Sequence, residues 1–166
     1  MSAYPAEKRG MHFIIVEKMQ ETLKTIKKQF LTFRNGIVAD TLRNAGMGCY
    51  HIIFGLNLPQ LTQIASSQKS SLPLAMALWA DKGVRESRLL ATYLFPREEV
   101  DMQLALRLMS EVQTQEEADM LAFRLLRHLP ILPALKQSTH QPPTQGHPTP
   151  TNPAAPAYMT RALARY

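Results

Sequence analysis

The chain has 166 residues, a formal net charge of +6 at pH 7, 45% hydrophobic residues and a single cysteine. This length suits one domain with a short tail, and one cysteine excludes an internal disulfide and favours a reducing compartment. No apolar run approaches the ~20 residues of a membrane span, so we expect a cytoplasmic protein without a membrane partner.

The first predicted element is a helix over residues 13–34. Residues 1–10 before it carry no helical pattern and are predicted to be flexible. Asn35-Gly36 ends the helix, and a short second helix is expected over 37–44. Apolar side chains at steps of three or four residues predict one buried stripe along the long helix: Ile15, Met19, Leu23, Ile26, Phe30 and Phe33.

Residues 50–54 alternate in a way that would suit a strand, with Tyr50, Ile52 and Phe54 on one side. No second strand is predicted nearby, so we interpret the segment as an extended connector or as the end of a helix.

A regular series of short helices follows. One begins near Pro59, the next is capped by Ser70 or Ser71, another spans 85–95, and another opens at Glu98 and Glu99. A last helix starts with a capping box formed by Thr114 and Glu117 and ends at Pro130. Helices this short must stack in pairs to bury their apolar stripes. We therefore predict an all-α domain of stacked helix pairs, an α-solenoid fragment, over residues 11–136.

The composition changes after Lys136. Residues 137–157 contain six of the twelve prolines, with Gln, Thr and Ser between them and no large apolar residue. The whole segment 137–166 is predicted to be a Pro-rich disordered tail, because it offers little apolar surface to bury. The alternative for residues 158–166 is a basic helical turn that carries Met159, Leu163, Arg161 and Arg165. Such a tail is a candidate contact for a protein partner.

Positive charge is concentrated near the N-terminus, where residues 1–72 hold nine Lys or Arg against four Asp or Glu. The candidates for contacts with nucleic-acid phosphates are Lys24, Lys27, Lys28 and Arg34, followed by Arg85 and Arg88. A salt bridge between helices is the alternative role for at least one of the last two arginines. Trp79, beside Leu78 on an apolar face, is predicted to lie in the core.

No metal or cofactor site is predicted. His12, His51 and His128 lie far apart in sequence, with no carboxylate or cysteine at the spacing of metal ligands. Cys49 has no neighbouring motif that would make it a nucleophile or a ligand.

Three segments in the middle of the chain follow one another in a set order: the run from Tyr50 to Leu61 around Phe54-Gly55, then Leu78-Trp79, then the run from Val84 to Ala91. Together they resemble the DNA alkylation repair family of HEAT-like proteins, which implies that the predicted helix pairs stack in the HEAT-like way. The resemblance implies a concave, basic surface of stacked helices that holds duplex DNA, and a catalytic aspartate in active members. Ala122 stands where that carboxylate would align, with Asp119 nearby.

These observations leave three hypotheses. The first is a DNA alkylation repair-like protein that binds duplex DNA through backbone phosphates without catalysis. The second is a divergent alkylbase DNA glycosylase that uses Asp119 or Asp101 as its carboxylate. The third is a scaffold that holds a protein partner, with the Pro-rich tail contributing to the contact.

Overall fold

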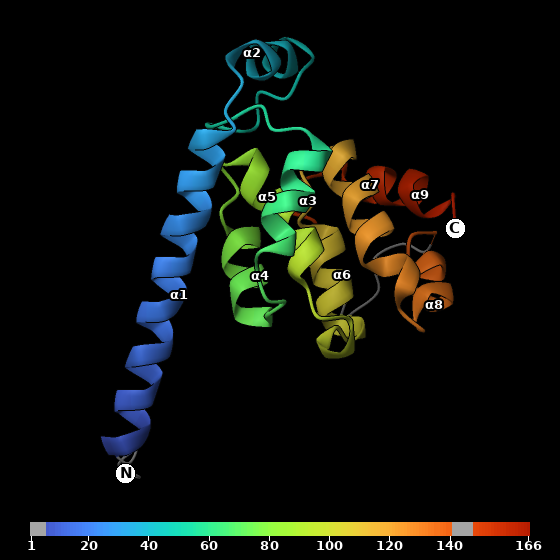
Figure 1. Ribbon diagram of the computed structural model, residues 1–166. Coiled ribbons are helices and arrows are strands. Elements are labelled where there is room, and N and C mark those ends of the chain that lie inside the picture. Colours follow the sequence, from blue (N-terminus) through green and yellow to red (C-terminus); the bar gives the residue numbers. More distant parts are fainter. Residues whose placement is uncertain (1–5, 141–147) are drawn as a thin grey trace.

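The computed structural model describes residues 6–140 and 148–166, and every regular element in these ranges is a helix (Figure 1), as predicted for an all-α protein. None of these helices is long and apolar enough to cross a membrane. The helices are α1 (Ala6–Thr32), α2 (Gly36–Asn44), α3 (Leu58–Ser66), α4 (Leu72–Ala80), α5 (Arg85–Leu94), α6 (Met102–Ser110), α7 (Gln115–Arg124), α8 (Leu132–Ser138) and α9 (Ala155–Leu163), with short 3₁₀ turns η1 (Arg97–Glu99) and η2 (Leu126–His128).

Helix α1 follows its predicted apolar stripe only in its second half. Ile26 and Phe30 are fully buried, Leu23 and Phe33 pack against the core, and Ile15 near the other end is exposed. The N-terminal half projects beyond the other helices (Figure 1). Residues 6–10 belong to this helix, so the prediction of a flexible segment over 1–10 is wrong for them. Residues 1–5 lie outside the described residues.

The short helices begin where the sequence signals predict, with local differences at their caps. Asn57 and Gln60 form a capping box at α3, and Pro59 and Pro73 lie in the first turns of α3 and α4. Ser71 occupies the N-cap of α4 without a side-chain hydrogen bond. Glu98 and Glu99 lie in η1 rather than opening a helix, and the cap of α6 is Asp101, which accepts a hydrogen bond from the Leu104 amide.

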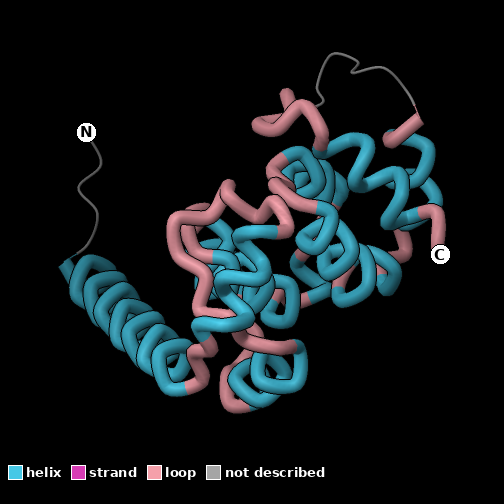
Figure 2. The backbone as a smooth tube through the Cα atoms, turned by 90° about the horizontal axis from the view of Figure 1, so that it is seen from above, coloured by secondary structure: helices cyan, strands magenta, loops and turns pink. Residues whose placement is uncertain are grey.

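The helices pack in a row. Helix α1 contacts α4, α4 contacts α5, and α5 also contacts α3 and α7. Helix α9 continues the row beyond α7, and α6 packs against α8 and α9. Figure 2 shows α1 at one edge of the molecule, away from the C-terminus. One contiguous apolar core runs through these contacts, from Phe30 on α1 to Leu163 on α9.

The segment between α2 and α3 is an extended connector, as one of the two interpretations of residues 50–54 expected. Ile52 forms an isolated parallel bridge with Val84, the residue before α5. Gly55 turns the connector toward α3 with φ of +81°, and its Cα lies against the backbone of Asn35 and Ala39. A side chain at this position would collide with that backbone, so the close approach of α2 to the connector requires glycine.

The C-terminal part differs from the predicted disordered tail. Residues 155–163 form α9, and Ala155, Met159, Ala162 and Leu163 are buried against the rest of the chain. Helix α8 also extends to Ser138, beyond the predicted domain end at residue 136. The prediction is therefore wrong for α9, because these four apolar side chains provide enough burial to offset the entropy of ordering it. Residues 141–147 lie outside the described residues.

Candidate functional site

Two clusters of charged side chains stand out, one buried and one at the surface. The centre of the buried cluster is Arg88 on α5, which is 0% exposed. Its guanidinium donates to both carboxylate oxygens of Glu117 on α7, at 3.0 Å from Nε and 2.8 Å from Nη2. It also donates to the backbone carbonyls of Trp79 and Glu111, both at 2.6 Å. Arg88 therefore links α4, α5, α7 and the end of α6.

Glu117 has its hydrogen-bonding capacity filled. Besides Arg88, it accepts from the hydroxyl of Tyr50 at 2.6 Å and from the amide of Gln113 at 2.8 Å. The predicted capping box is confirmed in one half, since the Glu117 amide donates to the hydroxyl of Thr114 at 3.1 Å. The Glu117 side chain, however, turns inward to Arg88. Burial, together with the negative charge of Glu117, raises the pKa of Tyr50 above its ordinary value.

A second buried carboxylate fixes the connector. Glu86 accepts hydrogen bonds from the backbone amides of Phe54, Gly55 and Leu56, at 3.0, 3.0 and 3.4 Å. Arg85 donates to Glu86 at 2.9 Å and to Glu116 on α7 at 2.8 Å. These bonds neutralise the carboxylate and hold the connector against α5.

The buried cluster changes the interpretation of several predicted residues. Arg85 and Arg88 are buried and paired with carboxylates, so they are not accessible to phosphates, and the predicted salt bridge between helices is confirmed for both. Trp79 lies in the core as predicted, with Nε1 donating to Glu111 at 2.8 Å and its ring beneath the Arg88 guanidinium. Every charged group of this cluster therefore has a partner within the fold.

The two carboxylates of the glycosylase hypothesis also have structural partners. Asp119 accepts from the Gln115 amide group at 2.9 Å and pairs with Arg165, which follows α9, at 3.5 Å. Asp101 caps α6. Each of these carboxylates thus has a partner within the fold, and the glycosylase hypothesis stays a prediction.

The basic residues of α1 are exposed, as a phosphate contact requires. Lys24, Lys28 and Arg34 have no ion-pair partner in the described part of the chain, whereas Lys27 pairs with Asp81 at 3.1 Å. Lys24, Lys27 and Lys28 lie along the C-terminal half of α1, and Arg34 just beyond it.

A second basic surface, which we call the arginine–aromatic surface, lies where α5 and α7 end. The Arg124 guanidinium lies 4.2 Å from the ring centre of Tyr93, and Arg127 lies 4.0 Å from that of Phe123 and 5.5 Å from that of Tyr166. Arg124 also donates to the Tyr93 hydroxyl at 3.1 Å. The surface comprises Tyr93, Arg97, Phe123, Arg124, Arg127, His128 and Tyr166.

The arginines of this surface are not paired with carboxylates of the described residues. Neither Arg97, Arg124 nor Arg127 forms an ion pair with a carboxylate of residues 6–140 or 148–166. Loss of hydration and the charges of Arg97 and Arg127 lower the pKa of His128. Its Nε2 accepts a hydrogen bond from Arg127 at 3.1 Å, which requires the neutral imidazole. Like charges gathered in this way favour an anionic ligand.

This surface was not predicted from the sequence. Arg97, Phe123 and Tyr166 lie far apart along the chain, and only the packing of α5, α7 and α9 brings them together. The sequence contained part of the pattern, because Phe123 and Arg127 are four residues apart, the spacing of neighbours on a helix.

No group of three or more potential metal ligands occurs among the described residues. The expectation that the chain holds neither a metal nor a cofactor stays a prediction.

No known protein family matches the sequence, and neither a curated protein nor a solved structure is similar enough to count as a match. The class that the described residues define is therefore an all-helical domain. The resemblance to the DNA alkylation repair family stays a prediction.

Proposed function

We propose that this protein binds nucleic acid through backbone phosphates and performs no covalent chemistry on it. The observation that carries the proposal is the arginine–aromatic surface, where Arg97, Arg124 and Arg127 are gathered without a carboxylate partner among the described residues. Guanidinium groups bind phosphate oxygens through paired N–H donors. Their aromatic neighbours hold two of them in place, which lowers the entropy lost on binding.

The arrangement of helices is consistent with this role. Helix α5 contacts both α3 and α7, and these contacts between helices two apart in the chain support a HEAT-like stack. The arginine–aromatic surface lies where α5 and α7 end. The exposed lysines of α1 lie at the other end of the row and would provide a second, weaker contact.

The proposal is tested by fluorescence anisotropy with labelled duplex and single-stranded DNA of the same sequence, titrated at low and at moderate salt. We expect binding that weakens steeply with salt, because each phosphate contact releases condensed counterions. The double variant Arg97→Gln/Arg127→Gln should bind more weakly, with the slope of log K against log salt reduced by about 0.9 for each lost contact.

Arg43→Gln is the matched control. Arg43 is a surface arginine paired with Asp40 on α2, so its loss removes one positive charge outside the proposed surface. A companion variant, Lys24→Gln/Lys28→Gln, measures how much the lysines of α1 contribute to the affinity for DNA. Absence of binding at low salt, or an Arg97→Gln/Arg127→Gln variant that binds like Arg43→Gln, would contradict the proposal.

A further inference from the structure

Aromatic rings and guanidinium groups alternate across the arginine–aromatic surface. The series runs Tyr93, Arg124, Phe123, Arg127 and Tyr166, and the distances from each guanidinium carbon to the neighbouring ring centres are 4.2, 5.1, 4.0 and 5.5 Å along it. Its members come from α5, α7, η2 and the residues after α9, so the packing of four segments brings them together. Each of the two cations in the series therefore has an aromatic neighbour on either side.

Two rings of this series are open to water. Phe123 is 39% exposed and Tyr166 is 40% exposed, and Phe13 on α1 is the one other exposed aromatic side chain among the described residues. Neither Phe123 nor Tyr166 belongs to the apolar core. An exposed ring leaves apolar surface in water, so Phe123 and Tyr166 can contact a planar ligand without a rearrangement of the core.

A strand of nucleic acid has a matching alternation of chemistry. Each nucleotide carries a negative phosphate, which arginine binds, and a planar base, which stacks on aromatic rings or on guanidinium planes. In a duplex the faces of the bases are covered by neighbouring bases, and exposing one face requires unstacking or flipping the base. The bases of a single strand can be stacked on a protein without this cost. Exposed rings beside free guanidinium groups therefore favour a single strand over a duplex.

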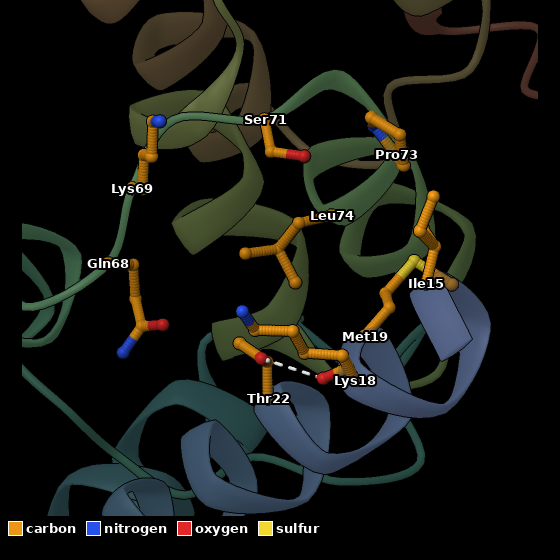
Figure 3. Close-up of a pocket in the computed structure, with 9 residues that line it drawn as sticks. All are labelled: Ile15, Lys18, Met19, Thr22, Gln68, Lys69, Ser71, Pro73 and Leu74. Carbon is orange, nitrogen blue, oxygen red and sulfur yellow. Dashed lines mark hydrogen bonds between the residues drawn. The ribbon is translucent and has the colours of Figure 1, made fainter. Parts of the chain in front are cut away.

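A groove beside α1 has positive charge without aromatic rings. It has a volume of about 360 Å³ and lies between α1 and the start of α4, with Lys18 and Lys69 among its lining residues. Figure 3 shows Leu74 and the aliphatic part of Lys18 directed into this space. The described residues that line it include no aromatic side chain, so the groove offers phosphates a contact but gives bases no ring to stack on. Its lysines therefore provide a control for charge alone.

We propose that the arginine–aromatic surface binds single-stranded nucleic acid, with unpaired bases stacked on Phe123 and Tyr166 and the phosphate between them on Arg127. Arg127 lies between the two exposed rings, at 4.0 Å from the ring centre of Phe123 and 5.5 Å from that of Tyr166. Every base has a π face, so this mode of binding does not select a sequence. The inference rests on the proposed binding of nucleic acid and adds which form is bound and through which contacts.

The test compares three labelled ligands of equal length by fluorescence anisotropy with the full chain: single-stranded oligothymidylate, an abasic strand and a duplex. Oligothymidylate and the abasic strand carry the same phosphates, and only the first has bases to stack. We expect oligothymidylate to bind about tenfold or more tightly than the abasic strand. At moderate salt it should also bind more tightly than the duplex, because salt weakens the phosphate contacts that favour the more highly charged duplex.

Variants separate stacking from charge. Phe123→Leu/Tyr166→Leu should weaken the binding of oligothymidylate about tenfold or more and leave its salt dependence unchanged, because the arginines remain. Phe123→Tyr/Tyr166→Phe keeps both rings and should bind like the wild type. Phe13→Leu is the matched control, since it removes an exposed ring outside the surface, and Lys18→Gln/Lys69→Gln removes two charges at the groove. Both controls should keep the preference for oligothymidylate over the abasic strand. Far-ultraviolet circular dichroism of Phe123→Leu/Tyr166→Leu should be unchanged, because neither ring lies in the core.

Three results would overturn the inference while leaving the proposed binding through phosphates in place. The first is equal, salt-dependent affinity for oligothymidylate and the abasic strand. The second is a duplex that binds more tightly than oligothymidylate at moderate salt. The third is a Phe123→Leu/Tyr166→Leu variant that binds oligothymidylate as tightly as Phe13→Leu does. Absence of binding to all three ligands at low salt would instead contradict the proposed function, and this inference with it.

Discussion

Arg88 on α5 and Glu117 on α7 form an ion pair in which both side chains are completely buried and joined by two hydrogen bonds of 3.0 and 2.8 Å. Removing water from two charges is costly, and the cost is recovered only when the remaining hydrogen-bonding groups are also satisfied. Here the Tyr50 hydroxyl, the Gln113 amide and two backbone carbonyls provide those partners. The pair therefore makes the contact of α5 with α7 specific.

The first prediction concerns the loss of one partner. Glu117→Gln should lower the free energy of unfolding by about 3–5 kcal/mol, because it leaves the Arg88 charge buried and unpaired. Urea denaturation measures this change. Asp40→Asn is the control, since Asp40 forms a surface pair with Arg43 that should contribute less than about 1 kcal/mol. Similar losses for the two variants would show that the Arg88–Glu117 pair is solvated in solution.

The second prediction concerns alkaline pH. Burial beside Glu117 raises the pKa of Tyr50, so the folded chain keeps this hydroxyl protonated at a pH where the unfolded chain loses the proton. The unfolded state is then favoured, and Tyr50 reduces stability as pH rises above about 10, the ordinary tyrosine value. Near neutral pH, Tyr50→Phe should have a lower free energy of unfolding than wild type. This difference in free energy should become smaller above a pH of about 10. A difference in stability between Tyr50→Phe and wild type that stays constant across this pH range would exclude a buried Tyr50 hydroxyl.

The third prediction compares two glycines that both have positive φ. Gly46 (φ +97°) has open space around its Cα, whereas a Cβ on Gly55 would collide with the backbone of Asn35 and Ala39. Gly46→Ala should cost about 1–2 kcal/mol of stability from backbone strain alone. Gly55→Ala adds a steric clash and should cost clearly more, as measured by thermal unfolding. Equal costs would mean that α2 can move away from the connector freely.

The fourth prediction tests the packing of α9. Met159 and Leu163 are almost fully buried against the rest of the chain. Leu163→Ala should therefore destabilise the protein by about 2–5 kcal/mol, through the lost burial and the cavity left behind. Ala157 is exposed on the same helix, so Ala157→Ser is a suitable surface control. If Leu163→Ala melted at the temperature of the control, α9 would not contribute to the folded core.

Much of the fold was predictable from local signals. The apolar stripe around Ile26 and Phe30, the proline-started helices at Pro59 and Pro73 and the cap at Thr114 all depend on residues close together in sequence. Helix α9 was predicted only as the less favoured alternative, a helical turn over residues 158–166, because prolines dominate the composition before it. Its signal was nevertheless present, since Ala155, Met159, Ala162 and Leu163 have the spacing of a helical face.

The candidate site was harder to predict because its charges are distributed by tertiary packing. Arg85, Arg88 and Arg127 are the same residue type, yet burial assigns the first two to carboxylates and leaves the third beside other cations. Sequence spacing could not distinguish them. The pairing of Arg85 with Glu86 and of Arg88 with Glu117 explains why these arginines are buried, but it becomes visible only when the packing of the helices is known.

The bonds from Glu86 to the amides of Phe54, Gly55 and Leu56 constrain how this protein can diverge. Loops between helices generally tolerate insertions and deletions, because their backbone faces water. The connector before α3 is different, since three successive amides are matched to one carboxylate whose position is fixed by α5. A single inserted or deleted residue would move these amides away from Glu86 and leave its buried carboxylate without hydrogen-bond donors from the connector. Related chains that keep Glu86 should therefore keep the length of this connector, and should vary in length at turns whose amides face solvent.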